Sequence, residues 1–179
     1  MRYAAAIWFS WVSAAFAGGA HDFTFPALEG GEIALADHAG EDLLIANTAS
    51  LCGFTPQYAD LQEVADTYAD QGLVVIGIPS DDFGGQELND AAEVRDFCTL
   101  NYGITFPLTD ITDVRGRDAH PFFDWIAEEG GRRALPKWNF TKLLVGRDGA
   151  CLGSRPSGVQ PTGREMRAAI EAALDAPTS

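Results

Sequence analysis

The apolar run from Leu73 to Ile78 constrains the fold of this chain more than any other feature. A short continuous apolar run of this kind is typical of a strand that is buried on both faces. A second apolar run extends from Leu43 to Asn47, and positions 56 to 69 between the two runs repeat apolar residues at three- and four-residue spacing, as an amphipathic helix does. This order of strand, helix and strand predicts a parallel strand pair with a right-handed crossover.

The other segments complete the prediction of one α/β domain, in which a mixed central sheet carries helices on both faces. Gly30-Gly31 separates two short strand-like segments and predicts an N-terminal hairpin, and Asp148-Gly149 is a strong turn signal between two later strands. No internal repeat, low-complexity tract or linker divides the 179 residues. The further expected elements are helices at 90–100, 120–129 and 162–174, the first capped by Asp90, and strands at 141–145 and 150–154.

Positions 1 to 17 have the pattern of a secretory signal peptide. A basic start, Met1-Arg2, precedes a largely apolar stretch, and Ala15-Phe16-Ala17 matches a signal-peptidase site. The stretch is shorter than the roughly 20 residues of a membrane-spanning helix, so a membrane anchor is the weaker alternative. We therefore expect a cleaved signal at 1–17, a single domain at 18–179 and an exported protein, periplasmic or secreted.

The charge of the chain excludes some classes of partner. With 12 basic and 26 acidic residues, the formal net charge is −14. This charge argues against non-specific attraction to nucleic acid or to anionic membrane surfaces. Because the acidic residues are spread along the chain rather than gathered in a tail, we interpret them as a solvated surface.

Cys52 is the leading candidate for a reactive nucleophile, because it follows the strand at 43–47 and precedes the helix at 56–69. Unpaired backbone N–H groups at a helix N-terminus stabilise a thiolate and lower the pKa of a thiol. Thr55 is a plausible N-cap, and Pro56 suits the first helical position. The alternative is a buried cysteine that behaves as a small hydrophobic residue.

Export would change the meaning of the cysteines, since disulfides persist in oxidising compartments. There are three, Cys52, Cys98 and Cys151, so at least one is unpaired or reactive. Cys52 and Cys98 could form a structural bridge or a catalytic redox pair, and their spacing does not decide between the two.

Two loops at predicted strand ends carry neutral hydrogen-bond donors. Gln86 lies in the loop after the strand at 73–78, and Trp138 and Asn139 precede the strand at 141–145. Such donors stabilise a thiolate and a developing oxyanion without protonating the nucleophile. The structural alternatives are a plain turn at Phe83-Gly84-Gly85 and a tryptophan that only packs in the core.

Three motifs in order resemble the cysteine-containing, non-selenium branch of the glutathione peroxidase family. They are the segment from Asn47 to Tyr58, the loop from Phe83 to Glu87, and Trp138-Asn139-Phe140, with His120-Pro121 between the last two. The resemblance covers almost the whole region after the signal and implies a thioredoxin-like fold. It also implies that Cys52 is the peroxidatic cysteine, that Gln86, Trp138 and Asn139 are its hydrogen-bonding partners, and that Cys98 is the resolving cysteine.

The chain departs from the family pattern at two places. Ser80-Asp81-Asp82 stands where many members have Cys-Asn-Gln, and Leu88 stands where they have a proline. Two carboxylates near the site would raise the pKa of Cys52, since a like charge opposes ionisation. The short connection from Trp125 to Lys137 resembles the monomeric branch of the family, so we expect a monomer.

The expected function is a thiol peroxidase that reduces hydrogen peroxide and organic or lipid hydroperoxides, with no metal or other cofactor. Its Cys52–Cys98 disulfide would be reduced by a thioredoxin-like protein or, less favoured, by glutathione. Because a helical Cys98 is expected to start out of disulfide reach, its helix would have to loosen. Cys151 is expected to be a buried structural residue.

Two other functions compete with this one. A thiol:disulfide oxidoreductase on the same fold normally needs Cys-x-x-Cys, and Thr55 stands at the position of the second cysteine. A copper-binding chaperone would need clustered thiolate and imidazole ligands, whereas His21, His38 and His120 have no metal-ligand spacing.

Overall fold

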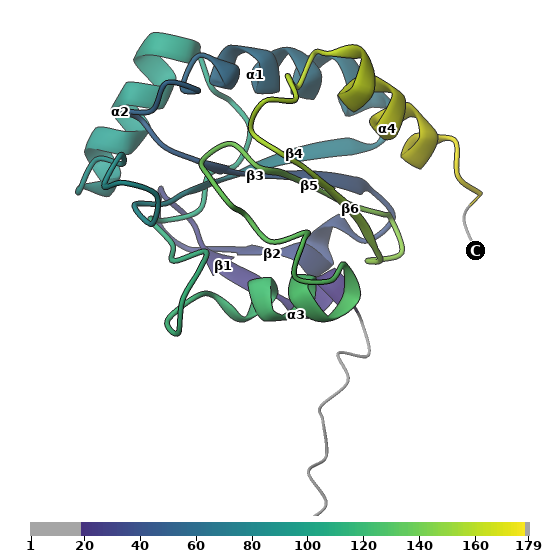
Figure 1. Cartoon of the computed structure of the whole chain (residues 1–179). Helices are drawn as coiled ribbons and strands as arrows, with labels where there is room; N and C mark the ends of the chain where they lie inside the picture. Colours follow the sequence, from purple (N-terminus) through teal and green to yellow (C-terminus); the bar gives the residue numbers. More distant parts are fainter. Residues whose placement is uncertain (1–18, 178–179) are drawn as a thin grey trace, which may run out of the picture.

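A computed structural model describes residues 19–177, so the expected signal peptide at 1–17 lies outside the described residues. A four-stranded sheet of order β4-β3-β5-β6 forms the centre, and a separate β1-β2 hairpin precedes it (Figure 1). The strands are β1 Thr24–Pro26, β2 Glu32–Ala34, β3 Asp42–Thr48, β4 Leu73–Pro79, β5 Lys142–Val145 and β6 Cys151–Arg155. The helices are α1 Gln57–Tyr68, α2 Ala91–Tyr102, α3 Pro121–Glu129 and α4 Arg164–Leu174, with short 3-10 turns at Gly19–Asp22, Leu35–His38 and Ala69–Gln71.

Strand pairing confirms the predicted mixed sheet. β3 and β4 are parallel, and α1 provides the crossover between them. β5 runs antiparallel to β3, with Ala46 opposite Lys142, and β6 runs antiparallel to β5. Because β5 is antiparallel, its first residues lie at the end of the sheet where β3 and β4 finish. The loop before β5 and the loop after β4 therefore meet at one edge.

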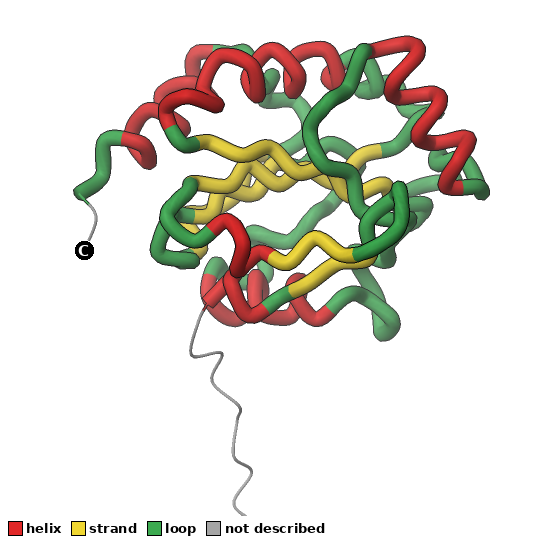
Figure 2. Tube along the Cα trace, turned by 180° about the vertical axis from the view of Figure 1, so that it is seen from behind, coloured by secondary structure: helices red, strands yellow, loops and turns green. Residues whose placement is uncertain are grey.

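Side chains on the two faces of the sheet build two separate core clusters. In β3, Leu44 and Ala46 belong to one cluster, and Leu43 and Ile45 belong to the other, as the two-residue period of a strand requires. The first cluster packs under α1, α2 and α4, and the second packs against the β1-β2 hairpin and α3. Figure 2 shows the helices of the first layer on one side of the sheet and the hairpin on the other.

Most helix boundaries agree with the predictions to within two residues. Asp90 caps α2 as expected, since its carboxylate accepts hydrogen bonds from the backbone N–H of Ala92 and Glu93. At α1, however, Pro56 occupies the cap position and Thr55 does not cap the helix. The prediction of a Thr55 N-cap is therefore wrong, and the hydroxyl of Thr55 is used in the turn before the helix.

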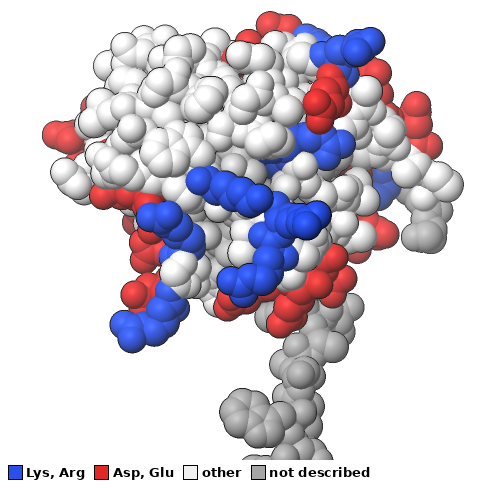
Figure 3. All heavy atoms as spheres, in the orientation of Figure 1, with Lys and Arg blue, Asp and Glu red and all other residues white. Residues whose placement is uncertain are grey.

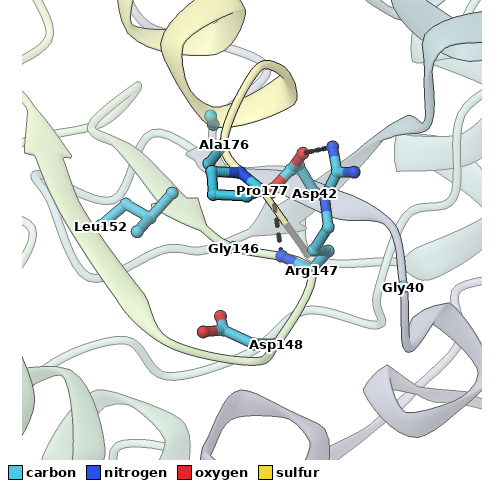
Figure 4. A pocket seen from close by; sticks show the side chains of 9 residues that line it. Gly40, Asp42, Gly146, Arg147, Asp148, Leu152, Ala176 and Pro177 are labelled. Carbon is cyan, nitrogen blue, oxygen red and sulfur yellow. Dashed lines mark hydrogen bonds and ion pairs between the residues drawn. The ribbon is translucent and has the colours of Figure 1, made fainter. Parts of the chain in front are cut away.

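A buried ion pair closes the end of the sheet opposite the finish of β3. Asp42, 1% exposed, accepts hydrogen bonds at 3.0 Å from the backbone N–H of Arg147 and at 2.8 Å from its Nη2. Nη2 also donates to the carbonyl of Leu174 at the end of α4. This pair lies in the wall of a hollow of about 260 Å³ (Figure 4).

Candidate active site

Cys52 lies in a tight turn between β3 and α1, and its side chain is 9% exposed. Its sulfur accepts a hydrogen bond from the N–H of Phe54 at 3.4 Å. The hydroxyl of Thr55 accepts from the N–H of Cys52 at 2.9 Å and donates to the carbonyl of Ala49 at 2.8 Å. These bonds fix the backbone around the thiol before the helix begins, so the sulfur has a defined position.

The loop after β4 is fastened directly to the Cys52 turn. The N–H of Leu51 donates to the carbonyl of Gln86 at 2.8 Å. The carboxylate of Glu87 accepts from the N–H of Ser50 at 3.0 Å and from the N–H of Leu88 at 2.9 Å. Burial raises the pKa of Glu87, against the lowering effect of these hydrogen bonds. Glu87 was not predicted to have a role, yet its carboxylate holds the loop after β4 to the Cys52 turn.

The structure also brings Asn139 to Gln86. Asn139 is fully buried, and its Nδ2 donates to Gln86 Oε1 at 3.1 Å and to the carbonyl of Phe83 at 3.4 Å. Because Oε1 is occupied, the two N–H donors of Gln86 remain for another acceptor. The ring of Trp138, 41% exposed, lies 5.9 Å from the ring of Phe83. Gln86, Trp138 and Asn139 are thus gathered beside the Cys52 turn, whereas their contact with sulfur stays a prediction.

Asn47, the penultimate residue of β3, anchors the segment that carries Trp138 and Asn139. Its Nδ2 donates to the carbonyl of Trp138 at 3.2 Å, and its Oδ1 accepts from the N–H of Thr141 at 3.1 Å. Its carbonyl accepts from the N–H of Phe140 at 2.6 Å. The sequence offered one sign of this role, a polar residue at the end of a buried strand.

Cys98 lies on the inner side of α2 and is fully buried in the same core cluster as Cys52 and Tyr58. Burial raises the pKa of Cys98 to about 11, although the nearby hydroxyl of Tyr58 lowers it and Glu87 raises it further. That hydroxyl is itself buried. In this conformation Cys98 is therefore a protonated thiol shielded from solvent.

Cys151 begins β6 and is only partly buried, against the second core cluster, whereas a buried residue was expected. All three cysteines are free. The carboxylate of Asp82 accepts hydrogen bonds from the N–H groups of Val114 at 2.6 Å and Arg115 at 3.1 Å. Asp81 accepts from the N–H of Glu87 at 3.2 Å. The two carboxylates of the Ser80-Asp81-Asp82 departure thus accept hydrogen bonds from loop N–H groups.

Lys and Arg side chains gather across the face of the molecule shown in Figure 3, although the chain is acidic overall. Arg133 and Lys137 line one hollow on the segment that leads to Trp138. The guanidinium of Arg115 lies 4.7 Å from the centre of the Phe83 ring. Basic side chains therefore lie near the segment that carries Trp138 and near Phe83.

Two absences apply to residues 19–177. No group of three or more His, Cys, Asp or Glu side chains in that part is arranged to hold a metal ion. None of its helices combines the length and the apolar character needed to cross a membrane. The hollow of Figure 4 is remote from Cys52, because its lining residue Asp42 begins β3 and Cys52 follows the other end of that strand.

Comparison of the sequence with known proteins gives one consistent family. A sequence model described as glutathione peroxidase matches residues 20–127. The chain is 41% identical over 162 residues to the hydroperoxy fatty acid reductase gpx1 of Synechocystis, covering 86% of this chain and 95% of that protein. It is 45% identical over 131 residues to the glutathione peroxidase homolog BsaA of Halalkalibacterium halodurans, covering 72% and 83%.

Solved structures agree and confirm the thioredoxin-like fold. The crystal structure of Trgpx in its apo form matches with a TM-score of 0.71 and 34% identity, covering 90% of this chain and 98% of that one. A thiol:disulfide interchange protein of the thioredoxin family from Chlorobium tepidum matches with a TM-score of 0.59 and 18% identity, covering 85% and 92%. The second likeness concerns the fold alone.

Proposed function

Because this chain belongs to the glutathione peroxidase family, we propose that Cys52 is the residue with which it reduces hydroperoxides. The family makes the chain a thiol peroxidase. One observation carries the assignment of the site: the Cys52 turn, Gln86 and Asn139 are joined by two hydrogen bonds, Leu51 N–H to the Gln86 carbonyl and Asn139 Nδ2 to Gln86 Oε1. These bonds hold neutral N–H donors beside the Cys52 thiol, an arrangement that suits attack of a thiolate on a peroxide.

In the first step the Cys52 thiolate attacks the terminal oxygen of the hydroperoxide. The S–O bond forms as the O–O bond breaks, so Cys52 is oxidised to a sulfenic acid and the peroxide is reduced to water or an alcohol. Gln86 and Trp138 supply N–H donors for the thiolate and the departing oxygen, which takes up a proton. Asn139, whose two side-chain N–H groups are bound to Gln86 and Phe83, orients Gln86. Since these donors are neutral, they do not protonate the nucleophile.

In the second step Cys98 attacks the sulfur of the sulfenic acid, giving a Cys52–Cys98 disulfide and water. A disulfide needs Cα atoms about 4.4–6.8 Å apart and a deprotonated attacking thiol. Cys98 is buried, with a pKa of about 11, so α2 must open for this step. Of the 12 residues of α2, only Val94 and Cys98 are buried, which makes α2 a segment with few core contacts to lose.

The disulfide is then reduced by exchange with an external dithiol, for which a thioredoxin-like protein is preferred over glutathione. An internal resolving thiol makes a second glutathione-dependent step unnecessary. From the sequence we also propose that the protein is exported through the signal at 1–17. We propose further that it is a monomer, because the connection between α3 and β5 is short. N-terminal sequencing of the secreted or periplasmic protein and light scattering test these two points.

For the substrate, we propose that the site accepts amphipathic hydroperoxides as well as hydrogen peroxide. Leu51, 60% exposed, and Trp138, 41% exposed, form apolar surface beside Cys52, and Arg133 and Lys137 add positive charge. This combination suits a hydrocarbon chain with an anionic end, the kind of substrate in the name of the Synechocystis relative. A KM for a fatty acid hydroperoxide that rises with salt, while that for hydrogen peroxide does not, is the expected result.

The decisive experiment measures peroxide consumption with thioredoxin and its reductase against glutathione and its reductase. Cys52→Ser is expected to abolish turnover, and retained turnover would contradict the assignment. Cys98→Ser is expected to give one turnover and then stall or overoxidise, whereas unchanged steady-state turnover with thioredoxin would remove its resolving role. Mass spectrometry of the oxidised wild type identifies the disulfide, and a metal titration tests the copper-binding alternative.

A further inference from the structure

Every backbone carbonyl from Trp138 to Phe140 accepts a hydrogen bond from a side chain. The carbonyl of Trp138 accepts from Asn47 and Thr141, and that of Asn139 accepts from the hydroxyl of Ser157 at 2.6 Å. The carbonyl of Phe140 accepts from Lys142 Nζ at 2.7 Å. We call the segment 138–141 with these bonds the donor turn.

The donor turn needs this support because its backbone is strained. Phe140 has a φ of 61°, a left-handed conformation that costs a residue with a Cβ roughly 1–2 kcal/mol. This conformation leaves Trp138 at the surface and Asn139 fully buried against Gln86. Strained backbone at a functional site persists only when surrounding contacts over-determine it. The bond from Lys142 to the strained residue itself is one of those contacts.

Lys142 also connects the donor turn to the start of α1. Its side chain is fully buried, and Nζ donates to Gln57 Oε1 at 2.9 Å and to the carbonyl of Ser157 at 3.3 Å, besides Phe140. Gln57, the first residue of α1, returns a bond from Nε2 to the carbonyl of Ser157 at 2.7 Å. A single ammonium therefore links the donor turn, the helix that follows Cys52 and the loop after β6.

We propose that Lys142 is a positioning residue for peroxide reduction, whose buried ammonium fixes the donor turn against the start of the helix that follows Cys52. The proposal rests on the proposed role of Cys52, of the donor Trp138 and of Asn139, which orients Gln86. It assigns Lys142 no contact with the peroxide. Its effect on the rate comes through geometry, since a displacement of about 1 Å in a reacting site can cost about 100-fold.

The ammonium form is required because of the number of its partners. An ammonium has three N–H donors and a neutral amine has two, so only the charged form satisfies Gln57, Phe140 and Ser157 together. All three partners are neutral, and burial lowers the pKa of Lys142 to about 8, although Asp60 raises it. Loss of the proton above pH 8 leaves one acceptor without its donor.

A test of the pH dependence has to consider the charged groups around Lys142. Asp60 on α1 favours the ammonium. Arg155, opposite Lys142 on β6, is paired at 3.0 Å with Glu165 of α4. A change in geometry around pH 8 is assigned to Lys142, because burial lowers its pKa to about 8.

The test follows oxidation of Cys52 by hydrogen peroxide in a single turnover, with the sulfenic acid trapped and quantified between pH 6 and 10. In the wild type the rate constant is expected to rise with thiol ionisation and then to fall with a midpoint of about pH 8. Lys142→Met is expected to lower the rate at pH 7 by about 10-fold or more and to lack the falling limb. Arg164→Met, which removes an exposed cation at the start of α4, is the matched control and should keep both the rate and the limb.

Two outcomes would overturn the proposal: a Lys142→Met protein with the wild-type rate, or a wild-type rate that does not fall up to pH 10. If Lys142→Met does not fold, Gln57→Met removes the link to α1 and is expected to lower the rate several-fold. The pH profile of the wild type then still tests the proposal, because it needs no variant. If wild-type Cys52 is not oxidised by peroxide at all, the proposed function has failed instead, so the two failures are distinguishable.

Discussion

Removal of the α2 cap should accelerate disulfide formation without changing peroxide reduction. Asp90 Oδ1 accepts hydrogen bonds from the N–H groups of Ala92 at 2.9 Å and Glu93 at 3.1 Å. Asp90→Ala removes both bonds and the favourable interaction of its charge with the helix dipole. Asp90 lies outside the Cys52 site, so the substitution acts on the helix that carries Cys98.

The magnitude follows from the loss of one cap. Replacing an N-cap aspartate with alanine costs about 1 kcal/mol of helix stability. If α2 opens before Cys98 attacks, the open population and the rate of disulfide formation both rise about 5-fold, since a tenfold change corresponds to about 1.4 kcal/mol. Hydrogen exchange of the α2 amides should rise by the same factor, and that of the α1 amides should stay unchanged.

Rapid-quench mass spectrometry measures both steps, from the appearance of the Cys52 sulfenic acid and its conversion to the disulfide. Asp90→Asn is the matched control, because asparagine caps helices about as well as aspartate, and it should behave almost as wild type. If Asp90→Ala speeds exchange in α2 but leaves disulfide formation at the wild-type rate, opening of α2 does not limit resolution and the reasoning is refuted.

Three further predictions concern the scaffold. Thr55→Val, which removes the hydroxyl that bridges the Cys52 turn, should lower the unfolding free energy by about 1–2 kcal/mol and slow Cys52 oxidation; an unchanged rate would show that the turn does not need the bridge. Burial lowers the pKa of His120, so the folded state binds a proton less readily than the unfolded state. Stability should fall as the pH drops below about 6.5, and a urea titration of His120→Gln should lack this fall. Asp42→Ala should cost about 3 kcal/mol by leaving Arg147 unpaired, with Cys52 oxidation at the wild-type rate.

The secondary structure could be predicted because its signals are local. The alternation of apolar residues, the caps and the turn residues act within a few positions, and they located β3, β4, α2 and the turn at Asp148-Gly149 to within two residues. The start of α1 was harder to predict, because threonine is a common N-cap residue. The hydroxyl of Thr55 instead donates to the carbonyl of Ala49 and accepts from the N–H of Cys52. Which backbone N–H donates to a hydroxyl depends on how the turn folds.

The residues of the candidate site could be predicted from motifs. The contacts that hold these residues in place could not. Gln86, Trp138 and Asn139 stood out as donors at strand ends, and the structure gathers them beside the Cys52 turn. Lys142 carried one visible sign, a charge within an apolar strand, but its three neutral acceptors come from other parts of the chain. No local pattern predicts that a lysine is fully buried.

The sequence by itself determined the elements and their order and indicated Cys52 as the candidate thiol, because helix and strand periods, turns and motifs are properties of neighbouring residues. Only the tertiary structure decided which groups meet. Asn47 holds Trp138 from 91 positions away, and Lys142 holds Gln57 from 85. Such bonds exist because β5 pairs antiparallel with β3, which places the start of β5 beside the end of β3. That register is set by the packing of the whole sheet, so the geometry around Cys52 is a property of the folded domain.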